Sequence, residues 1–199
     1  FFLKKNTPNK NKNKKYKKKI LIELLLSHHS EPMIFNCLIG KDLAKFYNAE
    51  CVGLIKKNDL YTKKIAESFG INKFEFIDED SFFLNLKFFV TALRSISYKD
   101  IENKIFNYKK DGYELGKSTL ENYYRFYNSE TKNKNKFLLY LYLSRAIKSN
   151  HQAQKIFQKK FKMFVLGENQ FIPNKIIFHC ALKNGTPVYT WEGSASIGF

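Results

Sequence analysis

Two histidines and a glutamate lie close together near the start of the chain, at His28, His29 and Glu31. A neutral imidazole or a carboxylate can accept the proton of a substrate hydroxyl, and both can hydrogen-bond to sugar hydroxyls. Pro32 follows and is typical of the first turn of a helix, whose N-terminus carries a partial positive charge. We therefore predict that Glu31, His28 and His29 are catalytic residues. In the alternative interpretation the histidines are exposed loop residues and Glu31 only stabilises the helix.

A second polar segment, Gly167 to Gln170, comes between a predicted strand and a predicted helix. In open α/β sheets, ligands bind beyond the carboxyl ends of the strands, and this rule selects the segment around His28 and the segment around Glu168. Glu168 and Asn169 are therefore predicted to bind the substrate.

The most distinctive segment, Tyr108 to Asn128, places glycines and an arginine among several tyrosines. Arginine binds phosphate or carboxylate through two parallel hydrogen bonds, and binding pockets combine aromatic faces with a few polar groups. Arg125 and Tyr113 are predicted to bind the substrate on this basis. Alternatively, the tyrosines pack the helix and Arg125 forms a surface ion pair.

The motifs that are absent limit the possible chemistry. The sequence has no G-x-G-x-x-G, no P-loop, no G-x-S-x-G elbow, no H-E-x-x-H and no C-x-x-C. The three cysteines, Cys37, Cys51 and Cys180, are too few and too far apart for a disulfide framework or a zinc knuckle. We expect no bound metal, and the cysteines suit a reducing compartment.

Charge is distributed unevenly over the 199 residues, whose net charge is +17. Residues 1–19 carry nine lysines and no acid, and the rest carries 26 basic and 18 acidic residues. Residues 1–18 are therefore predicted to form a basic disordered tail, which could touch an anionic membrane surface. Frequent lysine throughout the chain is the plainer explanation of the tail. Apolar residues are 44% of the chain, which excludes disorder of the whole, and no apolar run is long enough to span a bilayer.

Hydrophobic periodicity predicts strands that alternate with helices. Residues 19–199 are predicted to form an α/β domain, a Rossmann-like doubly wound parallel sheet with a helical insertion in the middle. The strands are expected at residues 19–26, 51–55, 74–77, 162–166 and 186–191, and the insertion begins at residue 81.

Two stretches resemble a known family. YKKDGYELGKSTLENYYRFYN resembles the Y-x-G-[IY]-x-[IL]-G-D/K…D-x-Y-x-R stretch of surface-polysaccharide biosynthesis proteins of the capsule and lipopolysaccharide type. FVLGENQFIPNKIIFHCALKNGTPVYT is similar to their G-x-x-x-R-x-A-x-x-x-G-x-x-V stretch, matched at Ala181, Gly185 and Val188. His179 stands where that family commonly has arginine, and Lys117 replaces the commoner acid, which speaks against a metal or base role there.

The resemblance implies the N-terminal half of a GT-B-like glycosyltransferase, which transfers a sugar from a nucleotide donor to a cell-surface glycan. This half would hold the glycan or lipid-linked acceptor. The nucleotide sugar would bind to a C-terminal half beyond these 199 residues, so no cofactor is expected in this chain. The location implied is the cytoplasm, with peripheral contact at the inner membrane surface through the basic tail.

The alternative function is a basic nucleic-acid-binding α/β module without enzymatic activity. The charge of +17 suggests it, but residues 20–199 contribute only +8 and hold no recognised nucleic-acid-binding motif, which disfavours nucleic acid as a partner. A receiver-like domain would need paired acids where His28 and His29 stand, and a flavodoxin-like domain would need a phosphate loop.

Overall fold

The computed structural model describes residues 18–25, 30–78, 80–126 and 135–191. The described residues divide into two compact units. The α/β unit takes its described residues from Phe1–Glu79, Phe157–Glu168 and Asn184–Phe199, and the helical unit comprises Asp80–Ile156 and Asn169–Lys183.

The α/β unit contains a five-stranded sheet whose paired strands all run parallel. Its order is β3-β2-β1-β4-β5, so the chain reverses its direction across the sheet after β3, as in doubly wound folds. This confirms the predicted α/β class and the parallel sheet. The strands are β1 (Lys18–Glu23), β2 (Ala49–Lys56), β3 (Phe74–Ile77), β4 (Met163–Leu166) and β5 (Val188–Thr190).

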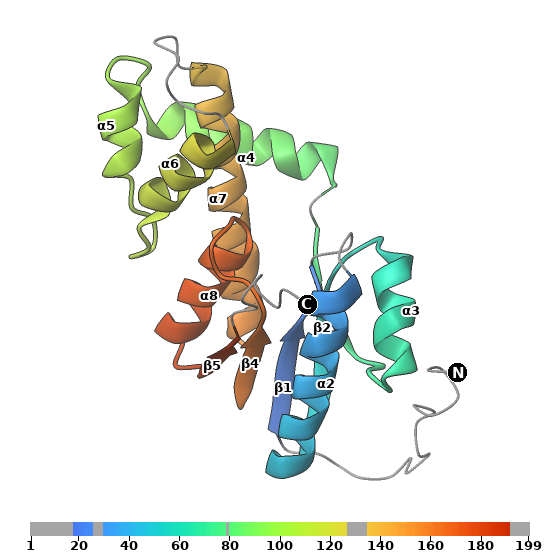
Figure 1. The fold of residues 1–199 in the computed structure, drawn as a ribbon. Helices are drawn as coiled ribbons and strands as arrows, with labels where there is room; N and C mark the ends of the chain where they lie inside the picture. The colour runs from blue at the N-terminus through green and yellow to red at the C-terminus, as the bar shows by residue number, and fades with distance from the viewer. Residues whose placement is uncertain (1–17, 26–29, 79, 127–134, 192–199) are drawn as a thin grey trace, which may run out of the picture. The chain divides into compact units, whose positions relative to one another are not determined.

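The central strand β1 is buried on both faces. Ile20, Leu21 and Ile22 have no exposed surface, which is typical of a parallel strand covered on both sides. Helix α2 (Ser30–Tyr47) packs on β1 and β2, and α3 (Leu60–Ser68) packs on β2 (Figure 1). A Cβ on Gly40 of α2 would lie 2.3 Å from Cδ1 of Ile22, so the absent side chain allows the close contact of α2 with β1.

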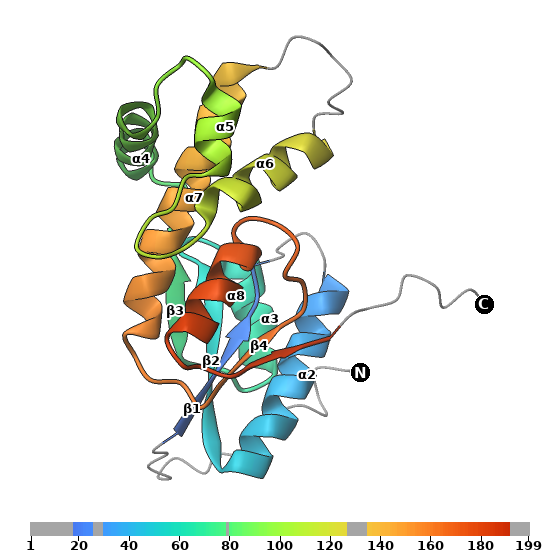
Figure 2. The ribbon, with the colours of Figure 1, turned by 90° about the vertical axis from the view of Figure 1, so that its left-hand side faces the viewer.

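The helical unit contains five helices in the described part of the chain, four of them before β4 and one after it (Figure 2). This matches the helical segment that the sequence predicts in the middle of the chain. The helices are α4 (Phe82–Ser95), α5 (Ile101–Phe106), α6 (Leu115–Phe126), α7 (Lys136–Phe157, whose last residue belongs to the α/β unit) and α8 (Asn174–Lys183).

Ser118 and Glu121 have the spacing of a capping box, which is typical of the start of a helix, but α6 does not begin there. Helix α6 begins three residues earlier, at Leu115, and Ser118 is buried inside it with its carbonyl accepting from the Asn122 side chain. In the first turn, the Gly116 N–H donates to the Tyr108 carbonyl at 3.0 Å. None of the described helices is long and apolar enough to cross a membrane.

Replacing Gly116 with alanine should separate α5 from α6. The new Cβ would lie 1.6 Å from the carbonyl oxygen of Ile105, and this backbone atom cannot move away as a side chain can. We expect Gly116→Ala to lower the free energy of unfolding by about 3 kcal/mol, measured by urea denaturation. Lys117→Ala, an exposed neighbour on the same helix, should change it by less than about 0.5 kcal/mol. Equal stability of the two variants would contradict this packing.

Candidate functional site

The structure places the predicted site residues in both units. Glu31 lies exposed in the first turn of α2, and Glu168 follows β4 in the same α/β unit. Strands β1 and β4 are hydrogen-bonded neighbours, so the two polar segments selected from the sequence do follow adjacent parallel strands. His28 and His29 lie outside the described residues, so their catalytic role stays a prediction.

The carboxyl end of β1 holds a buried acid that the sequence analysis did not select. Glu23 has no exposed surface, and its Oε1 accepts from the Leu25 N–H at 2.6 Å. Asn36 of α2 donates to Glu23 twice, at 2.8 Å to its carbonyl oxygen and at 3.0 Å to Oε2. The signal in the sequence is the single acid within the apolar run ILIELLL.

Asn36 also joins this cluster to the segment after β5. The Trp191 indole N–H donates to Asn36 Oδ1 at 2.7 Å, and a Cβ on Gly167 would lie 3.3 Å from both Asn36 and Trp191. The buried amide therefore links β1, α2 and the residues after β4 and β5. These contacts lie at the carboxyl edge of the sheet, where the strand order reverses, and they fix β1, α2 and Trp191 to one another.

The helical unit contains a pocket that is lined mostly by polar side chains. A pocket of about 430 Å³, here called the α6–α8 pocket, contains two of the predicted substrate-binding residues, Arg125 and Asn169. The other pocket residues come from α6, from the segment before α8 and from α8 itself: Glu121, Asn122, Gln170, Phe171, Lys175, Phe178 and His179.

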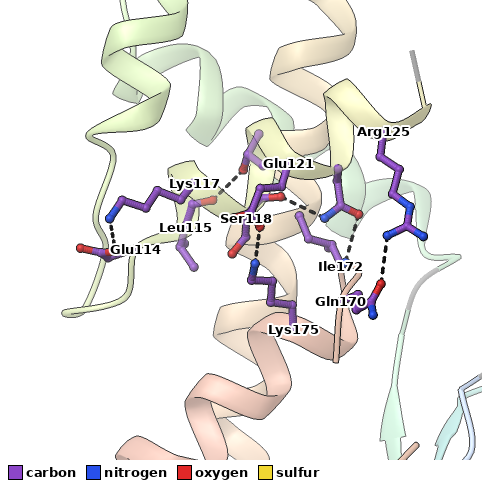
Figure 3. Close-up of polar contacts among 11 residues, drawn as sticks. Glu114, Leu115, Lys117, Ser118, Glu121, Arg125, Gln170, Ile172 and Lys175 are labelled. Atoms are coloured by element: carbon purple, nitrogen blue, oxygen red, sulfur yellow. Dashed lines mark hydrogen bonds and ion pairs between the residues drawn. The ribbon is translucent and has the colours of Figure 1, made fainter. Parts of the chain in front are cut away.

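Side chains of α6 hold the segment that precedes α8 (Figure 3). Asn122 is buried, and its Oδ1 accepts from the Ile172 N–H at 3.1 Å. Arg125 donates from Nη1 to Oε1 of Gln170 at 2.9 Å, and its guanidinium lies 4.2 Å from the centre of the Phe171 ring. The phenyl ring and the amide thus fix the plane of the guanidinium, and Arg125 remains exposed at the pocket.

The charges of the pocket are partly balanced within it. Lys175 of α8 forms an ion pair with Glu121 of α6. Arg125, the other cation of the pocket, forms no ion pair among the residues that the structure describes. Partial desolvation and the Lys175 ammonium lower the pKa of His179, and the carboxylates of Glu121 and Glu114 oppose the shift. The imidazole of His179 is therefore kept neutral at neutral pH, and a neutral imidazole can accept a proton.

Tyr113, also predicted to bind the substrate, lies in a neighbouring pocket of about 540 Å³ that shares Glu121, Lys175 and His179 with the first. Tyr113 is 7% exposed, and the Lys183 ammonium lies 4.4 Å from its ring centre. The structure therefore favours a packing role for Tyr113. Because Tyr113 also lines this pocket, its role in substrate binding stays a prediction.

The remaining titratable groups mainly stabilise the structure. Burial raises the pKa of Cys37 to about 12 and of Cys51 to about 11, so these thiols are unreactive near neutral pH. Hydrogen bonds from Lys109 and Lys117 lower the pKa of exposed Glu114 to about 2. No group of three or more metal-ligating side chains occurs among the residues that the structure describes.

Comparisons with known proteins give no family. No family model and no curated protein matches the sequence. A CDPS from Fluoribacter dumoffii has a solved structure that aligns with 88% of this chain and 88% of its own, with a TM-score of 0.44 and 9% identity. Similarity this low carries no argument about activity or substrate.

Asn36→Ala should destabilise the protein, because it leaves the Trp191 N–H and the buried Glu23 carboxylate without the amide that joins them. Loss of these hydrogen bonds between buried polar groups predicts a fall of about 3 kcal/mol in the free energy of unfolding. Urea denaturation measures it, with Asn72→Ala, at an exposed asparagine, as the control. A fall no greater than that of the control would contradict a structural role for the cluster.

His179 should titrate below the ordinary histidine pKa of about 6.5, as measured by NMR of its ring proton. Lys175→Ala should raise this pKa, because it removes a cation and frees the Glu121 carboxylate. Glu121→Gln should lower it further. An unshifted midpoint in both variants would show that His179 does not sense this ion pair.

Proposed function

We propose that this chain is the acceptor-binding half of a glycosyltransferase, and that the α6–α8 pocket holds the saccharide acceptor. The observation that carries the proposal is the set of side chains around the pocket. It combines a guanidinium, an ion pair, three amides and an imidazole with two phenyl rings, those of Phe171 and Phe178. Its volume of about 430 Å³ lies in the range of small-molecule sites.

A saccharide presents hydroxyls that both donate and accept hydrogen bonds, and it also presents faces of C–H groups. The amides of Asn169 and Gln170 can donate hydrogen bonds to sugar hydroxyls and accept hydrogen bonds from them, and the Glu121 carboxylate can accept. The Phe171 ring offers an apolar surface for a C–H face, although Arg125 covers one of its faces. Mixed donors and acceptors beside aromatic carbon therefore suit a sugar better than a purely apolar ligand.

The charge balance favours the acceptor over a nucleotide diphosphate. Lys175 is paired with Glu121, and among the residues that the structure describes Arg125 is the pocket cation without an ion pair. A diphosphate carries more charge than a single guanidinium neutralises, and the chain has no glycine-rich phosphate loop. One fixed, planar cation instead suits a saccharide with a single carboxylate, such as a uronic acid. The sugar-nucleotide donor would bind to a C-terminal half of the enzyme.

His179 lines this pocket and is its candidate base. Its neutral imidazole would take the proton of an acceptor hydroxyl while that oxygen forms a bond to the anomeric carbon of the donor sugar. The bond from this carbon to the donor phosphate would break, and the nucleotide would leave with the electron pair. Glu31, His28 and His29 remain the alternative base in the α/β unit.

The parallel sheet with its strand-order reversal is compatible with the proposed GT-B-like half, and the proposal extends to a cytoplasmic enzyme of cell-envelope glycan synthesis. Both rest on the resemblance stated from the sequence and on the side chains of the pocket.

Arg125→Ala should weaken binding of a uronate-containing tetrasaccharide about tenfold, since a charge-assisted hydrogen bond contributes about 1.5 kcal/mol. Arg125→Lys should weaken it similarly, because an ammonium lacks the planar fork and does not stack on Phe171 in the same way. Isothermal titration calorimetry with hyaluronan tetrasaccharide measures both variants, and neutral maltotetraose serves as the comparison ligand.

Arg145→Ala is the matched control, since Arg145 is an exposed arginine stacked on Tyr142 in α7, outside the pocket. Absence of binding of either saccharide to the unaltered chain would overturn the proposal.

A DNA column tests the alternative function. If the chain is still retained on the column in a salt-sensitive way after residues 1–19 are deleted, the nucleic-acid-binding function is favoured instead.

A further inference from the structure

Helix α4 carries an apolar face that is exposed to solvent. Phe82, Leu86, Phe89 and Leu93 follow one another at the spacing of one helix face, and Phe83 lies beside them. The exposed fractions are 71% for Phe82, 81% for Phe83, 48% for Leu86 and 45% for Leu93. An exposed cluster of large apolar side chains in a folded unit marks an interaction site. These five residues are called the α4 stripe below.

The neighbouring face of α4 is packed within the helical unit. Phe88 and Ala92 are buried, and the Phe88 ring centre lies 5.4 Å from that of His151 on α7. Asn85 accepts a hydrogen bond from the buried Lys148 ammonium of α7. Helix α4 is therefore fixed to α7 by one face, and the helix lies at the side of the helical unit (Figure 2). The stripe residues lie on the neighbouring face, where four of them are exposed and Phe89 is half-buried.

Residues at the start of α7 extend the apolar surface. Phe137 is 59% exposed, and its ring centre lies 5.5 Å from that of Phe89 in the stripe. The neighbouring Lys136 ammonium lies 3.9 Å from the centre of the exposed Tyr98 ring. Phenylalanine beside tyrosine and lysine is the composition of surfaces that lie in the interface of a lipid bilayer.

The charged residues of helix α4 itself are positive, whereas the acids Asp78 and Asp80 precede the helix. Lys87 and Arg94 are the charged residues of α4, and both are exposed. In a symmetric contact between two copies the same surface would face itself, so like charges would approach each other in a chain of net charge +17. An anionic surface instead attracts these cations, by about 1 kcal/mol for each residue near a charged membrane.

We propose that the α4 stripe docks on the surface of an anionic lipid bilayer. The phenylalanine and leucine side chains enter the boundary between headgroups and acyl chains, and Lys87, Arg94 and Lys136 contact the lipid phosphates. The helix lies in the membrane plane and does not cross it. This inference stands on α4 and the start of α7, and so it is independent of the α6–α8 pocket.

Vesicle flotation of the full chain tests the proposal, with phosphatidylcholine vesicles that contain 30% or no phosphatidylglycerol. Binding to the anionic vesicles is expected in 0.1 M salt and should persist in part in 0.5 M salt, which screens the lysine-rich N-terminal segment. The triple variant Phe82→Ser, Leu86→Ser, Leu93→Ser should lower the partition coefficient in 0.5 M salt about tenfold or more, because each lost side chain removes apolar burial.

The matched control replaces three exposed apolar residues of the α/β unit, Phe46→Ser, Leu60→Ser and Tyr61→Ser, and should bind as the unaltered chain does. Circular dichroism verifies that both triple variants are folded. Equal binding of the stripe variant and the unaltered chain in 0.5 M salt would overturn the proposal. The proposal would also be overturned if size-exclusion chromatography showed that the unaltered chain and the control variant are dimers and the stripe variant is a monomer. The partner of the stripe would then be a second copy of the chain.

Discussion

The hydrogen bond from the Ile172 N–H to the buried Asn122 side chain is the interaction on which the α6–α8 pocket depends. A buried backbone N–H must find an acceptor, and here the acceptor is carried by a neighbouring helix. The bond fixes the segment before α8 against α6. Gln170 and Phe171 lie in this segment, and they set the plane of the Arg125 guanidinium. In the proposed function, a planar cation held in this way would bind a carboxylate with little further loss of side-chain freedom.

The distribution of charge decides what this pocket can bind. Because Glu121 pairs with Lys175, Arg125 is the one pocket cation without an ion pair among the described residues, and desolvation lowers the pKa of His179. A single negative charge and several hydroxyls match that arrangement. The carboxyl end of the sheet has a different character, since Glu23 and Asn36 there use their polar atoms on each other and on the backbone. The α6–α8 pocket is the proposed ligand site, whereas the contacts of Asn36 stabilise the packing of β1, α2 and Trp191.

Much of the fold could be predicted from the sequence, because apolar periodicity and capping act locally. The run at Phe74–Ile77 is a strand as predicted. The helical insertion was expected to begin at residue 81, and Ser81 is the N-cap of α4, the first helix of the helical unit. The site was predictable only in part. Arg125 and Asn169 share a pocket as residue types suggested, but the roles of Glu23 and Asn122 depend on contacts with residues distant in the sequence. No local pattern specifies such contacts, although an acid inside an apolar run was a usable signal.

Mapping of saccharide binding by two-dimensional NMR tests the central claim most directly. The chain is labelled with ¹⁵N and titrated with hyaluronan tetrasaccharide. Our account predicts chemical-shift changes concentrated on the side-chain amides of Asn169 and Gln170 and on the Arg125 Nε–H, with the Trp191 indole unmoved. Shifts confined to Trp191 and the Asn36 amide would contradict it, because they would place the saccharide at the carboxyl end of the sheet.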